Sequence, residues 1–236
     1  MRVGIISSSE GFTFEQLCRG VAHLDVAFVV VTDRECGVER VCAARGIFCQ
    51  RIVTKDRREF SRRAAEALKE QGVDFVLLFF NRLVSTDLYA ALPTYNIHPA
   101  LLPAFPGLRA LKETREMGVR FAGATMHLVT EHADEGPIVA QVSTPIWPPV
   151  DEVQLADISF VQRIYLALLA VELQATNSLL AVPEQGTVEF LAKRPYSTTC
   201  NPSIVDDAML SFIRRIEGER GIQVTEQGLT SPSSAA

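Results

Sequence analysis

Three of the four histidines of this chain fall in one stretch, Tyr95–Gln141, together with an asparagine and an Asp-Glu-Gly turn. Asn96 and His98 are two positions apart, so in an extended segment both side chains project from the same face. An amide N–H beside an imidazole suits a reaction in which a carbonyl oxygen gains negative charge while a proton moves. A carboxylate supplied from elsewhere in the stretch, such as Asp134, would set the tautomer and charge of the histidine.

The residues that follow this polar pair forbid regular structure: Pro99, Pro103, Pro106 and Gly107. The pair is therefore expected to open onto a stiff loop. His127 either hydrogen-bonds structurally beneath the site or faces the substrate, and the sequence favours neither reading. His132 is expected on the surface of a loop. The spacing of the three histidines fits no common zinc pattern, so no metal site is predicted.

Apolar runs alternate with helical patterns in the first third of the chain. Strands are expected at 2–7, 26–33, 47–53 and 73–80. Between them we expect a helix that begins near Thr13 as its N-cap, a short helix within 34–46 and a surface helix over 56–72. This alternation predicts an α/β fold, a doubly wound and mostly parallel sheet with helices on both faces.

The rest of the chain continues this pattern with longer elements. We expect a helix over 108–118, strands over 121–129 and 137–147, a long helix from Asp151 to about Leu180, and an edge strand at 187–192. Residues 1–193 are interpreted as one catalytic domain. Residues 194–236 are interpreted as a peripheral C-terminal extension that is partly disordered, because it ends in the polar run SPSSAA.

Ligands of a doubly wound sheet bind beyond the carboxyl ends of its strands. Three loops are expected to meet there: 7–14, 81–84 and 96–107. The first contains Gly11 just before a helix N-terminus, an arrangement that suits an anion but is common in strand-to-helix turns. The site should therefore join this loop to the Asn96 and His98 pair.

The composition excludes several classes of function. The chain has 236 residues, 23 basic and 28 acidic, and no basic run long enough for a nucleic-acid groove. No apolar run approaches the ~18 residues of a membrane span, and the N-terminus does not have the pattern of a signal peptide. The five cysteines lack a CxxC spacing, so they are expected to be reduced and mostly buried thiols of a cytoplasmic protein.

Three linked motifs carry a resemblance to a known family. They are NIHPALLPAFPG at 96–107, GATMHLVT at 123–130 and DEGPIVAQ at 134–141. In this order and spacing they resemble the folate-dependent formyltransferases. The resemblance implies transfer of a formyl group from 10-formyltetrahydrofolate to a small-molecule amine, expected to be glycinamide ribonucleotide in purine biosynthesis. It implies no metal and leaves a homodimer possible.

The resemblance also implies roles for three residues. Asn96 would hydrogen-bond the formyl oxygen and stabilise its tetrahedral oxyanion. His98 would act on the same centre and help to move protons. Asp134 would hold His98 in its working state and relay the proton from the attacking amine.

The same resemblance implies where the folate lies. Its pterin would lie against Arg82, Leu83 and Val84 and against the loop that runs from Thr130 to Gly136. Backbone groups there can pair with the pterin edge, and the missing side chain of Gly136 allows a close approach.

Departures from the family pattern lie where the amine acceptor is expected. Gly11, Phe12 and Thr13 occupy the place of a Gly-Ser-Asn loop for the substrate phosphate, so a phenyl group replaces a small hydroxyl. Ala104 stands where a lysine is common, and Val161 lies near the place of an expected acidic residue. A different amine, or water as in 10-formyltetrahydrofolate deformylase, is therefore the alternative acceptor.

Overall fold

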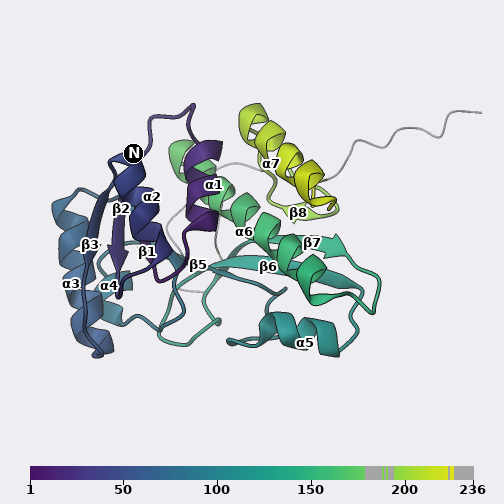
Figure 1. Cartoon of the computed structure of the whole chain (residues 1–236), viewed down its shortest axis with the longest axis horizontal. Coiled ribbons are helices and arrows are strands. Elements are labelled where there is room, and N and C mark those ends of the chain that lie inside the picture. The colour runs from purple at the N-terminus through teal and green to yellow at the C-terminus, as the bar shows by residue number, and fades with distance from the viewer. Residues whose placement is uncertain (179–187, 189, 191–193, 223, 226–236) are drawn as a thin grey trace, which may run out of the picture.

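The structure is a computed structural model that describes residues 1–178, 188, 190, 194–222 and 224–225. Its body is an eight-stranded sheet with the order β3-β2-β1-β4-β5-β6-β7-β8 (Figure 1). The strands are β1 Arg2–Ser7, β2 Ala27–Thr32, β3 Phe48–Arg51, β4 Phe75–Phe79, β5 Thr94–His98, β6 Phe121–Leu128, β7 Ile138–Pro145 and β8 Cys200–Asn201. The helices are α1 Phe12–Gly20, α2 Gly37–Arg45, α3 Arg57–Glu70, α4 Thr86–Tyr89, α5 Ala110–Glu116, α6 Glu152–Ala175 and α7 Asp207–Arg220.

The first five strands are parallel, and β6, β7 and β8 each run antiparallel to the strand before them. The predicted doubly wound, mostly parallel sheet is therefore confirmed. Because β1 lies between β2 and β4, the connections diverge at β1, and sheets of this kind bind ligands beyond the carboxyl end of the strand where the connections diverge. Two of the expected loops meet there, since the Ser8 hydroxyl donates to the Asn81 side-chain oxygen over 3.0 Å.

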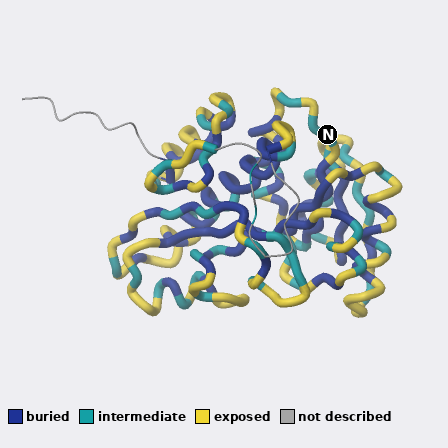
Figure 2. Tube along the Cα trace, turned by 180° about the vertical axis from the view of Figure 1, so that it is seen from behind, coloured by how far each residue is buried: buried dark blue, intermediate teal, exposed yellow. Residues whose placement is uncertain are grey.

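Alternation along each strand builds a core on both faces of the sheet. In β1, Val3 and Ile5 belong to the larger apolar cluster, which α1, α6 and α7 cover, whereas Ile6 belongs to the cluster beneath α3 and α4. Figure 2 shows the buried trace running through the sheet with exposed turns around it. A strand buried on both faces needs an uninterrupted apolar run, and this is why β1, β2 and β4 could be predicted from sequence.

The long helix α6 is the centre of the larger cluster. By length and composition it could cross a membrane, but 67% of its most apolar window is buried inside the molecule. The helix was expected from Asp151 to about Leu180. Asp151 is its N-cap, whose side chain accepts a hydrogen bond from the Gln154 N–H over 2.7 Å, and the helix ends at Ala175. An apolar helix covered by a sheet and two further helices is a core helix of this domain.

The expected N-cap of α1, Thr13, is wrong by two residues. The helix begins at Phe12 with Gly11 as its N-cap, at φ 88°. A Cβ at Gly11 would lie 2.9 Å from the Val38 Cα, so this position needs both the left-handed backbone and the missing side chain of glycine. Sequence reasoning favoured the threonine because hydroxyl side chains commonly cap helices.

The expected edge strand at 187–192 lies mostly outside the described residues, as does the SPSSAA end. Within the described part of the extension, β8 pairs with β7, and Met209, Ile213 and Ile216 of α7 are buried in the larger cluster. The boundary at 193 stays a prediction, but β8 and α7 share a core with the catalytic body and are not peripheral to it.

Candidate active site

The site is built on the register between β5 and β6. Asn96 lies opposite His127, and His98 lies opposite Thr125, on two antiparallel strands. The alternate residues of β5, Tyr95 and Ile97, belong to the core cluster beneath α6. The four polar side chains therefore project together from the other face, as the i and i+2 spacing of Asn96 and His98 predicted.

The His98 ring is held by contacts at both nitrogens. Its Nε2 donates to the Phe105 carbonyl oxygen over 2.7 Å, and its Nδ1 lies 3.4 Å from Asp134 Oδ2. Only 5% of the side chain is exposed. With Nε2 committed to a backbone carbonyl, Nδ1 is the nitrogen that can exchange a proton with the carboxylate.

Asp134 projects from the loop between β6 and β7 with φ 60°. Its Oδ2 accepts the Gly107 N–H over 2.8 Å, and its Oδ1 lies 3.6 Å from His127 Nε2. The His127 imidazole contributes most to lowering the pKa of Asp134, joined by the Gly107 N–H and the charge of His98, against the opposing effect of burial. The carboxylate is therefore ionised and faces two imidazoles.

His127 fixes the direction of the Asn96 amide. Its Nδ1 donates to the Leu128 carbonyl oxygen over 2.9 Å, and its Nε2 lies 3.1 Å from Asn96 Nδ2 and 3.6 Å from Asp134 Oδ1. A protonated Nε2 pairs with the carboxylate, whereas Nε2 of the neutral ring accepts a hydrogen bond from the Asn96 amide. One N–H of the amide is thereby used, and the second is left to point at a ligand. His127 contacts both Asn96 and Asp134 within the protein, and a direct role toward the substrate stays a prediction.

This arrangement suits acyl transfer. An amide N–H can stabilise a developing oxyanion, an imidazole and a carboxylate can move a proton, and all three groups lie at one strand end. Among the residues that the structure describes, no group of three His, Cys, Asp or Glu side chains is arranged to hold a metal.

The glycine of the Asp-Glu-Gly turn is required by packing. A Cβ at Gly136 would lie 1.7 Å from the Leu128 carbonyl oxygen, so no other residue fits without moving the backbone. The Thr130 hydroxyl donates to the His132 carbonyl oxygen over 3.3 Å within the same loop, and His132 is exposed as expected. These contacts hold the 130–136 loop, and with it Asp134, against the end of β6.

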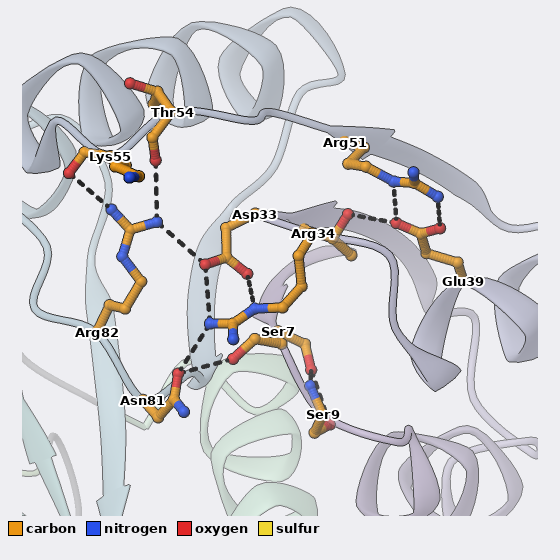
Figure 3. A network of polar contacts seen from close by, with 12 residues as sticks. Ser7, Ser9, Asp33, Arg34, Glu39, Arg51, Thr54, Lys55, Asn81 and Arg82 are labelled. Carbon is orange, nitrogen blue, oxygen red and sulfur yellow. Dashed lines mark hydrogen bonds and ion pairs between the residues drawn. The ribbon is translucent and has the colours of Figure 1, made fainter.

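Arg82 is committed to partners within the protein (Figure 3). Its guanidinium donates to Asp33 Oδ2 over 3.0 Å and to the Thr54 and Lys55 carbonyl oxygens. Burial opposes ionisation of Asp33, but hydrogen bonds from Arg34 and Arg82 outweigh it and lower the pKa of Asp33. Sequence reasoning missed this, because Asp33 lies 49 positions from Arg82 and only the fold brings the ends of β2 and β4 together.

The neighbours of Arg82 differ in accessibility. Leu83 is 59% exposed, whereas Val84 is buried in the cluster beneath α3 and α4. A ligand on this segment would therefore meet the Leu83 side chain and the backbone. The predicted role of the three residues in folate binding stays a prediction.

Phe12 lies on the surface of the first loop, while Gly11 is buried against α2. Phe12 is 66% exposed, so its ring does not plug the loop, and Thr13 is half-buried. The Gly11 N–H donates to the Ser9 hydroxyl over 3.3 Å, and Ser9 Oγ lies 2.9 Å from Ser7 Oγ. Serine hydroxyls thus line the start of α1, while the role of the loop as a phosphate site stays a prediction.

On α6, the residues near the expected acidic position pack in the core or form hydrogen bonds within the protein. Val161 is fully buried in the larger cluster, and the Gln162 amide donates to the Ala122 carbonyl oxygen and the Thr144 hydroxyl. The Arg163 guanidinium donates to the Ser159 carbonyl oxygen. The carboxylate that would meet the substrate amine is therefore not supplied by these positions.

The chain is similar to known proteins over most of its length. The formyl transferase family model matches residues 1–161. Phosphoribosylglycinamide formyltransferase of Mycobacterium tuberculosis is 31% identical over 196 residues, which cover 79% of this chain and 91% of that protein. The crystal structure of glycinamide ribonucleotide transformylase 1 from Symbiobacterium toebii superposes with a TM-score of 0.75 at 31% identity, covering 81% of this chain and 94% of that one.

Two further relatives match over shorter stretches. The chloroplastic phosphoribosylglycinamide formyltransferase of Arabidopsis thaliana is 33% identical over 157 residues, and the chain spans about half of its length, 53%. Formyltetrahydrofolate deformylase of Bacillus subtilis is 36% identical over 117 residues, which cover 48% of this chain and 39% of that protein.

Proposed function

Because this chain belongs to the formyl transferase family, we propose that it transfers the formyl group of 10-formyltetrahydrofolate to the amine of glycinamide ribonucleotide in purine biosynthesis. The observation that supports this most directly is the convergence of Asn96, His98 and Asp134 at one strand end, with 3.4 Å between the last two. Relatives that carry this activity by name cover most of the chain.

We infer a role for each of the three side chains. The amine nitrogen attacks the formyl carbon, and the free N–H of Asn96 stabilises the oxygen that becomes negative. The proton lost by the amine nitrogen passes toward Asp134 and His98 Nδ1, which lie together as an ionised carboxylate and an imidazole. Collapse of the intermediate breaks the bond to N10 of the folate, which takes up a proton, and leaves the formylated amine.

We place the folate against the Arg82–Val84 segment and the 130–136 loop. The exposed Leu83 side chain supports this placement, whereas the space beside Gly136 is filled by the Leu128 carbonyl oxygen. The phosphate of the acceptor would lie at Gly11–Thr13, where the serine hydroxyls and the start of α1 offer hydrogen-bond donors.

Hydrolysis of 10-formyltetrahydrofolate is the second candidate. It is favoured by the buried Val161 at the expected acidic position and by the exposed Phe12 in the acceptor loop. Both features weaken the acceptor half of the site and leave the formyl-donor half intact. A named deformylase is also a relative of this chain.

One assay separates the two functions. Purified protein is mixed with 10-formyltetrahydrofolate, with and without glycinamide ribonucleotide, and both formate and formylated product are measured. Transfer predicts product formation that requires the amine, whereas hydrolysis predicts formate at the same rate with and without it.

Two variants then test the site. Asn96→Ala is expected to lower kcat by about 100- to 1,000-fold, the effect of losing one oxyanion donor. Asp134→Asn should also be strongly impaired, while the adjacent exposed Glu135→Gln serves as its control and should match the wild type. Wild-type turnover in Asn96→Ala would contradict the assignment.

A further inference from the structure

Three neighbouring strands place a row of polar side chains next to the catalytic histidine. His98 of β5 is paired with Thr125 of β6, and Thr125 is paired with Gln141 of β7. Paired residues of a sheet project to the same face, so Thr125 and Gln141 extend the site across the strands. Their side chains form no hydrogen bond with the His98 ring or with Asp134, and their polar groups reach the turn that follows His98.

The Thr125 hydroxyl is fully used by that turn and by Gln141. It donates to the Ala100 carbonyl oxygen over 2.7 Å and accepts the Leu102 N–H over 3.0 Å. It also accepts from Gln141 Nε2 over 3.1 Å, and the same amide donates to the Leu102 carbonyl oxygen over 2.9 Å. Thr125 is fully buried, so water cannot replace these bonds without a change of structure.

Side-chain packing also fixes the turn at 100–102. A Cβ at Gly123 would lie 2.4 Å from the Leu101 Cγ, so Leu101 occupies the space that glycine leaves on β6. Gly123 and Thr125 are two positions apart on the same strand and face. One seats the Leu101 side chain, and the other binds the backbone on both sides of it.

The turn leads directly to the group that orients His98. The carbonyl of Phe105, three residues beyond Leu102, accepts the His98 Nε2 proton. Phe105 has φ 54°, a left-handed conformation that aromatic residues seldom adopt. Its carbonyl direction therefore needs support from the preceding turn, since the local backbone does not favour it.

We propose that Thr125 and Gln141 are positioning residues, which hold the turn at 100–102 so that the Phe105 carbonyl fixes the His98 ring for proton transfer. This inference rests on the proposed formyl transfer for its kinetic consequence, but its structural part concerns the His98 ring alone. The two residues act as one unit because they share the Thr125 hydroxyl and both bind Leu102.

The test compares two buried threonines that are each changed to valine. Thr125→Val removes the hydroxyl with little change of shape and is expected to lower kcat by about 10- to 100-fold, the range for a misplaced catalytic group, with little change in KM for the folate. Thr144→Val is the matched control, because Thr144 is also buried in the sheet and accepts one hydrogen bond from Gln162. Thr125→Ser, which keeps the hydroxyl, should restore most of the rate.

A second readout does not depend on turnover. In proton NMR, the His98 Nε2 proton that binds the Phe105 carbonyl is assigned by its loss in His98→Asn. We expect its exchange with solvent to quicken in Thr125→Val and in Gln141→Leu, and to stay as in the wild type in Thr144→Val. In the double variant Thr125→Val with Gln141→Leu, this proton should exchange little faster than in either single variant, since both changes remove the same support.

The possible outcomes are separable. The positioning role is overturned if the His98 Nε2 proton of Thr125→Val exchanges with solvent at the wild-type rate. It is also overturned if the kcat of Thr125→Val equals that of Thr144→Val. If the wild type forms no formylated product, the proposed function fails, and exchange of the His98 proton still decides whether the two residues position the ring.

Discussion

At the scale of single residues, Asp134 and His127 define the electrostatics of the site. The carboxylate lies 3.4 Å from one imidazole and 3.6 Å from the other. His127 uses Nδ1 for a backbone carbonyl, and this leaves Nε2 to accept from Asn96. A histidine that carried protons on both nitrogens could not accept from the amide, so the neutral ring is the form that orients Asn96 as an N–H donor.

The lowered pKa of Asp134 has a measurable effect on stability. Because its folded pKa lies below the ordinary 3.8, folding favours the ionised form, and this stabilisation is complete above the ordinary value. It is lost as the pH falls through the lower folded value. We expect the difference in free energy of unfolding between wild type and Asp134→Asn, measured in urea, to shrink as the pH falls from about 5 toward about 3. Glu135→Gln should show no such trend, and a difference that grew in acid would refute the assignment.

At the scale of elements, the strands were the most predictable part of the molecule. Buried apolar runs predicted β1, β2 and β4. The spacing of Asn96 and His98 predicted that their side chains share one face of the sheet. The place of Asp134 came from resemblance, because a loop residue has no periodicity to locate it. Thr125 and Gln141 were missed, since one threonine and one glutamine in a strand look like ordinary sheet residues until the register is known.

The loop between β6 and β7 depends on one glycine. Gly136→Ala would place a Cβ 1.7 Å from the Leu128 carbonyl oxygen, so we expect a loss of about 1–3 kcal/mol in stability, as for other overpacked sites, and weaker binding of the folate. Gly218→Ala is the control, because a Cβ there meets nothing within 4 Å in α7, and replacing a helical glycine by alanine should stabilise by up to about 1 kcal/mol. Thermal unfolding measures the stability of both variants, and folate titration measures their affinity for folate. Equal stability and equal affinity in Gly136→Ala and Gly218→Ala would contradict the role of Gly136.

At the scale of the whole molecule, the C-terminal segment completes the layer over the sheet. In Figure 1, α7 lies along α6 on the same side of the sheet as α1. Sequence reasoning predicted no helix at 207–220, where Met209, Ile213 and Ile216 form an apolar stripe at helical spacing, and it interpreted the segment as peripheral because of the polar run SPSSAA at its end. Burial of that apolar stripe depends on α6, more than thirty positions earlier, and local patterns cannot show it.

The buried carboxylate of Glu172 ties this segment to α6. It forms an ion pair with Arg194 and accepts the N–H groups of Val205 and Asp206 over 2.8 and 2.6 Å, just before α7 begins. Glu172→Gln would leave the Arg194 guanidinium buried without its counter-charge, so we expect a loss of roughly 3 kcal/mol in the free energy of unfolding. Amide exchange across 207–220 should quicken more than exchange in β1 and β4, because the anchor of α7 is lost while the parallel sheet remains. The exposed Glu219→Gln in α7 is the matched control, and α7 exchange in Glu172→Gln no faster than in that control would show that the helix is held by its apolar face alone.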